Sequence, residues 1–114
     1  MTVRAIVEKL DLQVLTEEAD LDREVTGGYA SDLLSDVIAH AQAGNLWVTL
    51  QTHANIVAVA TLKELPAIVF VNGRRPEAEV LARARQEKVA LLGTSLAAFE
   101  LVGRMYQIGV RGGG

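Results

Sequence analysis

The chain has 114 residues, half of them apolar, and a formal net charge of −3. This length suits a single domain with one core. The sequence contains no cysteine, which excludes disulfides and thiolate ligation of a metal and favours a reducing cytoplasm. Lysines and arginines are scattered among carboxylates and no apolar run is long enough to span a bilayer, so we expect neither a nucleic acid partner nor a membrane.

The first third of the chain reads as a helix followed by two strands. Apolar residues recur at helical spacing over residues 3–10, and residues 12–15 are typical of a short strand. After a carboxylate-rich stretch that includes Glu17 and Glu18, Val25 and Thr26 begin a second strand. We expect this strand to end in a glycine turn at residues 27–28.

A second helix is expected after Ser31 or Asp32, because the side-chain oxygen of either residue can cap it. Gly44 ends this helix, and residues 46–50 then form a buried strand. The helix has an apolar stripe made of Leu33, Leu34, Val37, Ile38 and Ala41.

Residues 53–65 are apolar on almost every side, which predicts a helix that is buried or lies in an interface. Thr52 is its expected cap. The competing interpretation is a strand, since the segment is rich in β-branched residues. Residues 67–71 form the next strand, with a turn at residues 72–73.

Pro76 marks the first position of a helix that runs to about residue 88, with Val80, Leu81 and Ala84 facing inward. Residues 89–92 give the last strand, and Thr94 or Ser95 is expected to cap the last helix. The predicted inward face of that helix comprises Leu96, Phe99, Val102, Met105 and Tyr106.

Short apolar strands that alternate with helices predict an α/β fold. We expect three layers, with a mainly parallel sheet of four to five strands between helices. Residues 1–110 form this single domain, and residues 111–114 are expected to be a flexible glycine tail.

In an open parallel sheet, ligands bind outside the carboxyl ends of the strands. The residues expected there supply hydroxyls, backbone N–H groups and guanidinium groups suited to a phosphate or carboxylate. The candidate ligand-binding residues are Thr26, Gly27, Gly28, Ser31, Thr52, His53, Arg74, Arg75 and Thr94. For each of them the alternative is a role in a cap or turn only.

The sequence offers no recognisable catalytic set. The glycine pair lacks the lysine of a P-loop and the third glycine of a dinucleotide motif. Asp32 and Asp36 share a helix face, but two carboxylates alone make a weak cation site, and neither His40 nor His53 has a partner at metal-ligand spacing. We therefore expect no metal, no cofactor and no enzyme activity; as an enzyme, the chain would depend on Asp32, Asp36 and His53.

The run Asp22, Arg23, Thr26, Gly27 and Gly28, followed by Tyr29, Ser31, Asp32 and Leu33, resembles the signature of the DRTGG domain family. The likeness continues through Trp47 to Thr49, residues 55–60, Asn72 and Gly73, Pro76 and residues 92–95. The resemblance implies the fold of the N-terminal domain of HPr kinase, without its separate P-loop kinase domain. It also implies that domains of this kind occur together with other modules, such as nucleotide-sensing CBS pairs.

Three functions follow as hypotheses. The first is a non-catalytic regulatory module, a homodimer that senses a small anionic ligand such as a nucleotide and acts in trans on a partner protein. The second is a purely structural module that dimerises or docks a partner through the apolar segment Ala54 to Leu62. The third is a small enzyme.

Overall fold

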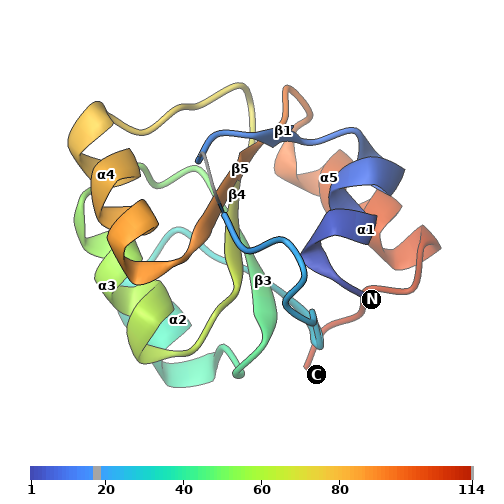
Figure 1. Ribbon diagram of the computed structural model, residues 1–114. Helices are drawn as coiled ribbons and strands as arrows, with labels where there is room; N and C mark the ends of the chain where they lie inside the picture. The colour runs from blue at the N-terminus through green and yellow to red at the C-terminus, as the bar shows by residue number, and fades with distance from the viewer. Residues whose placement is uncertain (17–18, 114) are drawn as a thin grey trace.

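The computed structural model describes residues 1–16 and 19–113 and has three layers, with a central sheet between two groups of helices (Figure 1). The elements in chain order are α1 (Val3–Leu10), β1 (Gln13–Val14), β2 (Gly27–Ala30), α2 (Leu34–His40), β3 (Asn45–Thr49), α3 (Asn55–Leu62), β4 (Ala67–Phe70), α4 (Ala78–Glu87), β5 (Ala90–Gly93) and α5 (Ala98–Gln107). Helices α2, α3 and α4 cover one face of the sheet, and α1 and α5 cover the other. The predicted α/β class and three-layer arrangement are confirmed.

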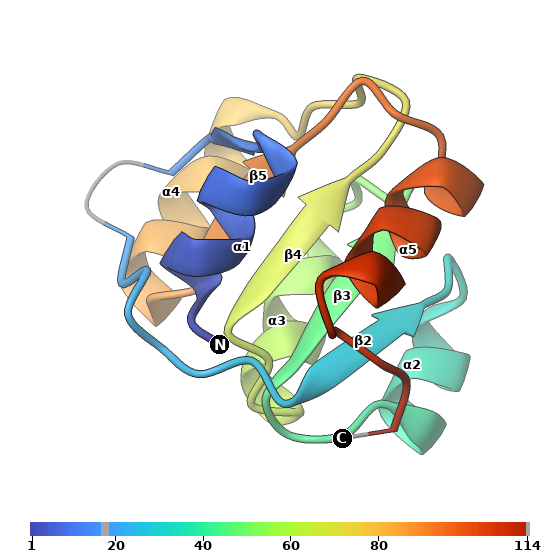
Figure 2. The same cartoon turned by 90° about the vertical axis from the view of Figure 1, so that its right-hand side faces the viewer.

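The sheet has five strands in the order β1-β5-β4-β3-β2. Strands β2 to β5 are parallel, and only β1 is antiparallel to its neighbour. Parallel strands need helical crossovers on the sheet faces, and this explains the alternation of strand and helix along the chain. The carboxyl ends of β2, β3, β4 and β5 therefore meet at one edge (Figure 2).

Alternate residues of each central strand enter two separate cores. Val48 and Val69 pack toward α1 and α5, whereas Trp47 and Ile68 pack toward α2, α3 and α4. All five residues of β3 and all four of β4 are buried. Burial on both faces is why these strands read as continuous apolar runs rather than alternating ones.

Residues 55–62 are helical, as predicted, and four of the eight face the core. An exposed stripe remains, because Ala54, Ala58 and Leu62 lie four residues apart and are all exposed. The interpretation of this segment as a strand was wrong, although its β-branched residues favoured it.

The glycine turn predicted after Val25 and Thr26 was wrong. Gly27 and Gly28 begin β2, and neither has a positive φ. The strand instead ends at Ala30, followed by the loop that contains Ser31. This shift of the strand moves the glycines from the carboxyl end of β2 to its amino end.

The predicted side-chain caps were also wrong for three helices. Helices α2, α3 and α5 begin after Leu33, Ala54 and Ala97, and no side chain caps them. The Thr94 hydroxyl accepts a hydrogen bond from the Leu96 N–H within a loop. Pro76 likewise lies before Glu77, the residue that precedes α4, and not at the first helical position.

Two predicted apolar faces require correction. Of the stripe predicted on α2, Val37 and the C-terminal Ala41 are buried, whereas Leu33 and Ile38 are exposed. On α5 the buried residues are Leu101 and Met105, while Phe99 is 92% exposed.

Of residues 111–114, predicted to be a flexible glycine tail, residues 111–113 contact the sheet, and residue 114 lies outside the described residues. Gly112 forms a parallel bridge with Gly28, and the Gly28 N–H donates to the Arg111 carbonyl at 2.8 Å. The Asn45 side-chain amide donates to the Gly113 carbonyl at 3.2 Å. Residues 111–113 thus lie against the outer strand of the sheet (Figure 2).

Candidate ligand-binding site

Six of the nine predicted ligand-binding residues lie in the loops at the carboxyl edge of the sheet. They are Ser31 after β2, Thr52 and His53 after β3, Arg74 and Arg75 after β4, and Thr94 after β5. Backbone hydrogen bonds join the last two loops, because the Gly73 N–H donates to the Thr94 carbonyl at 2.9 Å. The sheet therefore brings hydroxyl, imidazole and guanidinium groups to one edge.

Asp32 fixes the β2–α2 loop to the end of β3. Its Oδ1 atom accepts hydrogen bonds from the Thr49 hydroxyl at 2.8 Å and from the Leu50 N–H at 2.7 Å. The buried Trp47 indole N–H adds a third link to this loop, donating to the Ser31 carbonyl at 2.8 Å. These bonds fix the backbone of one side of the candidate site.

Two pockets flank the β3–α3 loop, one on each side of the sheet. The larger, about 320 Å³, is lined by Gln51, Thr52, His53, Ala54, Glu77, Glu79 and Val80. The smaller, about 190 Å³, is lined by Ala30, Ser31, Asp32, Val48, Thr49, Leu50, Val71 and Ala98. Both pockets contain carboxylates, which favour hydrogen-bond donors of a ligand over its negative groups.

The His53 ring is oriented by the start of α3. Its Nδ1 atom accepts a hydrogen bond from the Asn55 N–H at 3.2 Å. In a neutral ring, the hydrogen then resides on Nε2, which makes Nε2 a donor at the pocket of Glu77 and Glu79.

The two arginines differ in their surroundings. Arg75 donates to the Gln13 side-chain oxygen at 2.7 Å, which connects the β4–α4 loop to β1. Within residues 1–16 and 19–113, the exposed Arg74 guanidinium has no hydrogen-bond or ion-pair partner. Arg74 is thus the more available of the two cations for an anionic ligand.

The structure places Thr26, Gly27 and Gly28 at the opposite edge of the sheet. Gly27 pairs with Asn45, the first residue of β3. The Thr26 hydroxyl donates to the Ala43 carbonyl at 3.0 Å and so ties β2 to the turn before β3. These three residues therefore do not join the other six predicted residues.

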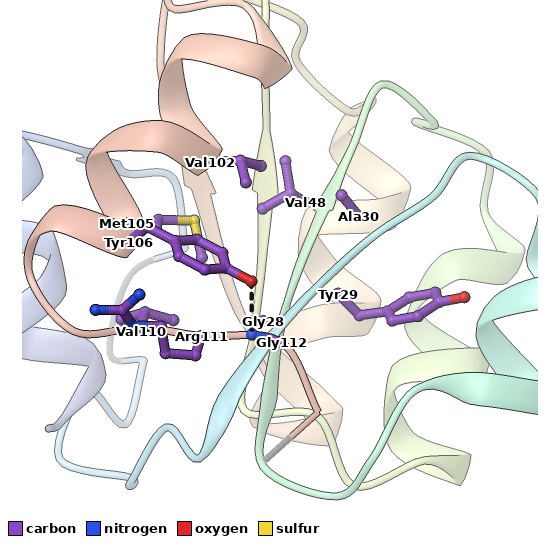
Figure 3. Close-up of a pocket in the computed structure, with 10 residues that line it drawn as sticks. All are labelled: Gly28, Tyr29, Ala30, Val48, Val102, Met105, Tyr106, Val110, Arg111 and Gly112. Atoms are coloured by element: carbon purple, nitrogen blue, oxygen red, sulfur yellow. Dashed lines mark hydrogen bonds between the residues drawn. The ribbon is translucent and has the colours of Figure 1, made fainter.

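Gly28 instead lines a mostly apolar pocket of about 140 Å³ between β2 and α5, which the sequence reasoning missed (Figure 3). Met105 and Tyr106 of α5 form one wall, and the Tyr106 hydroxyl accepts a hydrogen bond from the Gly112 N–H at 3.4 Å. The Arg111 guanidinium lies 5.0 Å from the centre of the Tyr106 ring. These contacts assign the glycine to the packing of the chain end.

The residues considered for catalysis have separate structural partners. Asp36 accepts hydrogen bonds from the Tyr29 hydroxyl at 2.8 Å and from His40 at 3.0 Å. Hydrogen bonding from Ser31, then from Tyr29 and His40, lowers the pKa of Asp36, and the bond to Asp36 raises the pKa of Tyr29.

Across residues 1–16 and 19–113, no group of three or more His, Asp or Glu side chains is arranged to hold a metal ion. In the same residues, no helix has the length and apolar character needed to cross a membrane.

Comparison with known proteins gives a match in structure only. No family model matches the chain, and no curated protein matches its sequence. Its fold is similar to the CBS and DRTGG domains of the regulatory region of Clostridium perfringens pyrophosphatase, complexed with the activator diadenosine tetraphosphate. The TM-score is 0.69 at 11% sequence identity.

The similarity covers 93% of this chain and 46% of the neighbour, so this chain spans less than half of that regulatory region. At this identity the likeness shows the fold alone. The fold agrees with the sequence resemblance to a DRTGG-like domain. The neighbour is described as part of the regulatory region of a pyrophosphatase.

Proposed function

We propose that this chain is a non-catalytic regulatory module that binds a small anionic ligand, such as a nucleotide, at its carboxyl-edge loops. The ligand-bound module then acts in trans on a partner protein. The observation that carries the proposal is the gathering of Arg74, His53 and Thr94 at this edge, in a fold shared with a regulatory region. That neighbour is described in complex with a nucleotide activator.

The charged residues of the site favour different chemical groups of a ligand at two different places. Arg74 and the hydroxyl of Thr94, which lie in loops joined by the Gly73–Thr94 backbone hydrogen bond, suit a phosphate, since a guanidinium offers several donors to its oxygens. Glu77 and Glu79 line the adjacent pocket, where they suit the amino groups of a base and disfavour phosphate. A ligand that carries both groups, such as an adenine nucleotide, matches this arrangement better than inorganic phosphate does.

Thermal unfolding in the presence of ligands tests the proposal, with the fluorescence of the buried Trp47 as the signal. The panel contains diadenosine tetraphosphate, ATP, adenosine, inorganic phosphate, a phosphosugar and an acyl phosphate. A ligand present at about 100 times its dissociation constant stabilises the native state by about 2.7 kcal/mol, which raises Tm by several degrees. We expect adenine nucleotides to raise Tm most.

Arg74→Gln removes the proposed phosphate contact and is expected to abolish most of this shift. Arg85→Gln is the matched control, because Arg85 lies in the last turn of α4, away from the helix start beside the pocket. A shift that is the same in both variants would reject the site. A panel without any shift would reject ligand sensing itself.

The exposed stripe of α3 favours a second candidate function, a purely structural docking module. Leu62, at 67% exposure, ends the stripe that begins at Ala54. An exposed apolar stripe of this kind is suited to a partner's apolar surface. If the ligand panel is negative and Leu62→Lys abolishes co-purification of a partner that the wild-type chain retains, docking replaces sensing as the function.

A further inference from the structure

The outer face of α5 carries a large apolar side chain next to a glycine, which has no side chain. Phe99 is 92% exposed, and Gly103 follows one helical turn later. A Cβ atom on Gly103 would meet no atom within 4 Å, so the space above this residue is open. Both residues border a groove of about 570 Å³ between α1 and α5, which lie on the same side of the sheet (Figure 2).

The same face carries two opposite charges with the same spacing. Glu100 and Arg104 are also one helical turn apart and form an ion pair of 3.3 Å. Their side chains are 59% and 50% exposed, so the pair lies in solvent and adds little to the stability of the monomer. Both groups remain accessible to a second molecule.

These two spacings match one antiparallel arrangement of two α5 helices. A two-fold axis between residues 101 and 102 places position 99 of each copy level with position 104 of the other, and position 100 level with position 103. Gly103 then lies within one residue, or about 1.5 Å along the axis, of the level of the other copy's Phe99, and Arg104 lies equally close to the level of the other copy's Glu100. A two-fold interface requires a surface that is complementary to itself, and this helix face satisfies that condition in shape and in charge.

We propose that α5 is the self-association surface of this chain, with Phe99 of each copy inserted beside Gly103 of the other in the groove between α1 and α5. The antiparallel helices also place opposite ends of their dipoles together, which favours the contact. Glu100 and Arg104 exchange their intrahelical pair for two pairs between copies and so fix the register.

Sedimentation velocity on the whole chain, from low micromolar to near millimolar concentration, tests this interface. We expect a concentration-dependent dimer. Phe99→Ser is expected to raise its dissociation constant about thirtyfold, the effect of losing a central aromatic residue from an interface. Gly103→Leu fills the receiving space and is expected to weaken the dimer similarly. Circular dichroism melts check that both variants stay folded, as the exposure of both positions predicts.

Charge reversal tests the register separately from the apolar contact. Glu100→Arg and Arg104→Glu each place like charges opposite one another and are expected to weaken the dimer, whereas the double variant restores it. Leu62→Ser on α3 is the matched control for loss of an exposed apolar residue and is expected to leave the dimer unchanged. The proposal is overturned by a wild-type chain that is monomeric throughout, or by a dimer that weakens in Leu62→Ser but persists in Phe99→Ser.

Discussion

Gly28 and Met105 approach so closely that a Cβ atom on Gly28 would lie 2.9 Å from the Met105 Cε atom. Met105 is only 3% exposed and belongs to the core beneath α5. The absence of a side chain at Gly28 therefore leaves room for the Met105 side chain of the last helix.

Replacement of Gly28 by valine is expected to lower the free energy of unfolding by about 1–3 kcal/mol, because it overpacks this contact. Gly28→Ala costs less, since the flexible end of Met105 can move aside. Urea denaturation followed by Trp47 fluorescence measures both effects. In a Met105→Ala background the cost of Gly28→Val should shrink; an undiminished cost would show that another feature of β2 requires the glycine.

Gly44 and Gly73 offer a matched comparison of two positions with positive φ. Their φ angles are +84° and +69°, so alanine is strained at both by about 1–2 kcal/mol. A Cβ atom on Gly44 would also lie 2.7 Å from the Thr26 Oγ1 atom, whereas one on Gly73 would meet nothing within 4 Å. Gly44→Ala is thus expected to destabilise the protein by at least about 1 kcal/mol more than Gly73→Ala. Equal costs in chemical denaturation would contradict a steric role for Thr26.

The lowered pKa of Asp36 predicts a defined pH dependence of stability. Hydrogen bonds from Ser31, Tyr29 and His40 favour its charged form, so its pKa in the folded state is below the ordinary value of 3.8. This contribution is fully present above that ordinary value and is lost as the pH falls through the lowered pKa. We expect Asp36→Asn to lower Tm at neutral pH, with a difference from wild type that narrows under acidic conditions. A difference in Tm that is constant with pH would contradict the attribution of this stability to the charged form of Asp36.

The central strands could be predicted from the sequence because both are buried on both faces: β4 is an unbroken apolar run, and β3 is apolar at its three central residues. β2 could not be placed correctly, because its sequence begins with two glycines and has no apolar pattern. The contact that favours a glycine at position 28 is with Met105, which lies far away in the sequence. The residues around Gly28 therefore give no sign of this contact.

The candidate site could be predicted in part, because its position depends on where the strands end. His53, Arg74 and Thr94 follow strands whose ends were predicted well, so their shared edge followed from the parallel order of the sheet. Thr26 was placed there only because the end of β2 was misplaced. The caps failed because hydroxyls and carboxylates near a helix start also serve loops, as Asp32 does by accepting hydrogen bonds from Thr49 and Leu50.

The two ends of the strand order show how this protein limits unwanted growth of its sheet. At one edge, β1 is only two residues long and antiparallel to β5. At the other edge, residues 111–113 lie against β2 and use the Gly28 N–H that would otherwise face outward. Within residues 1–16 and 19–113, neither edge thus presents a long row of unpaired backbone groups, the feature that templates cross-β aggregation. Removal of residues 111–113 is therefore expected to leave the Gly28 N–H unpaired at the β2 edge of the sheet.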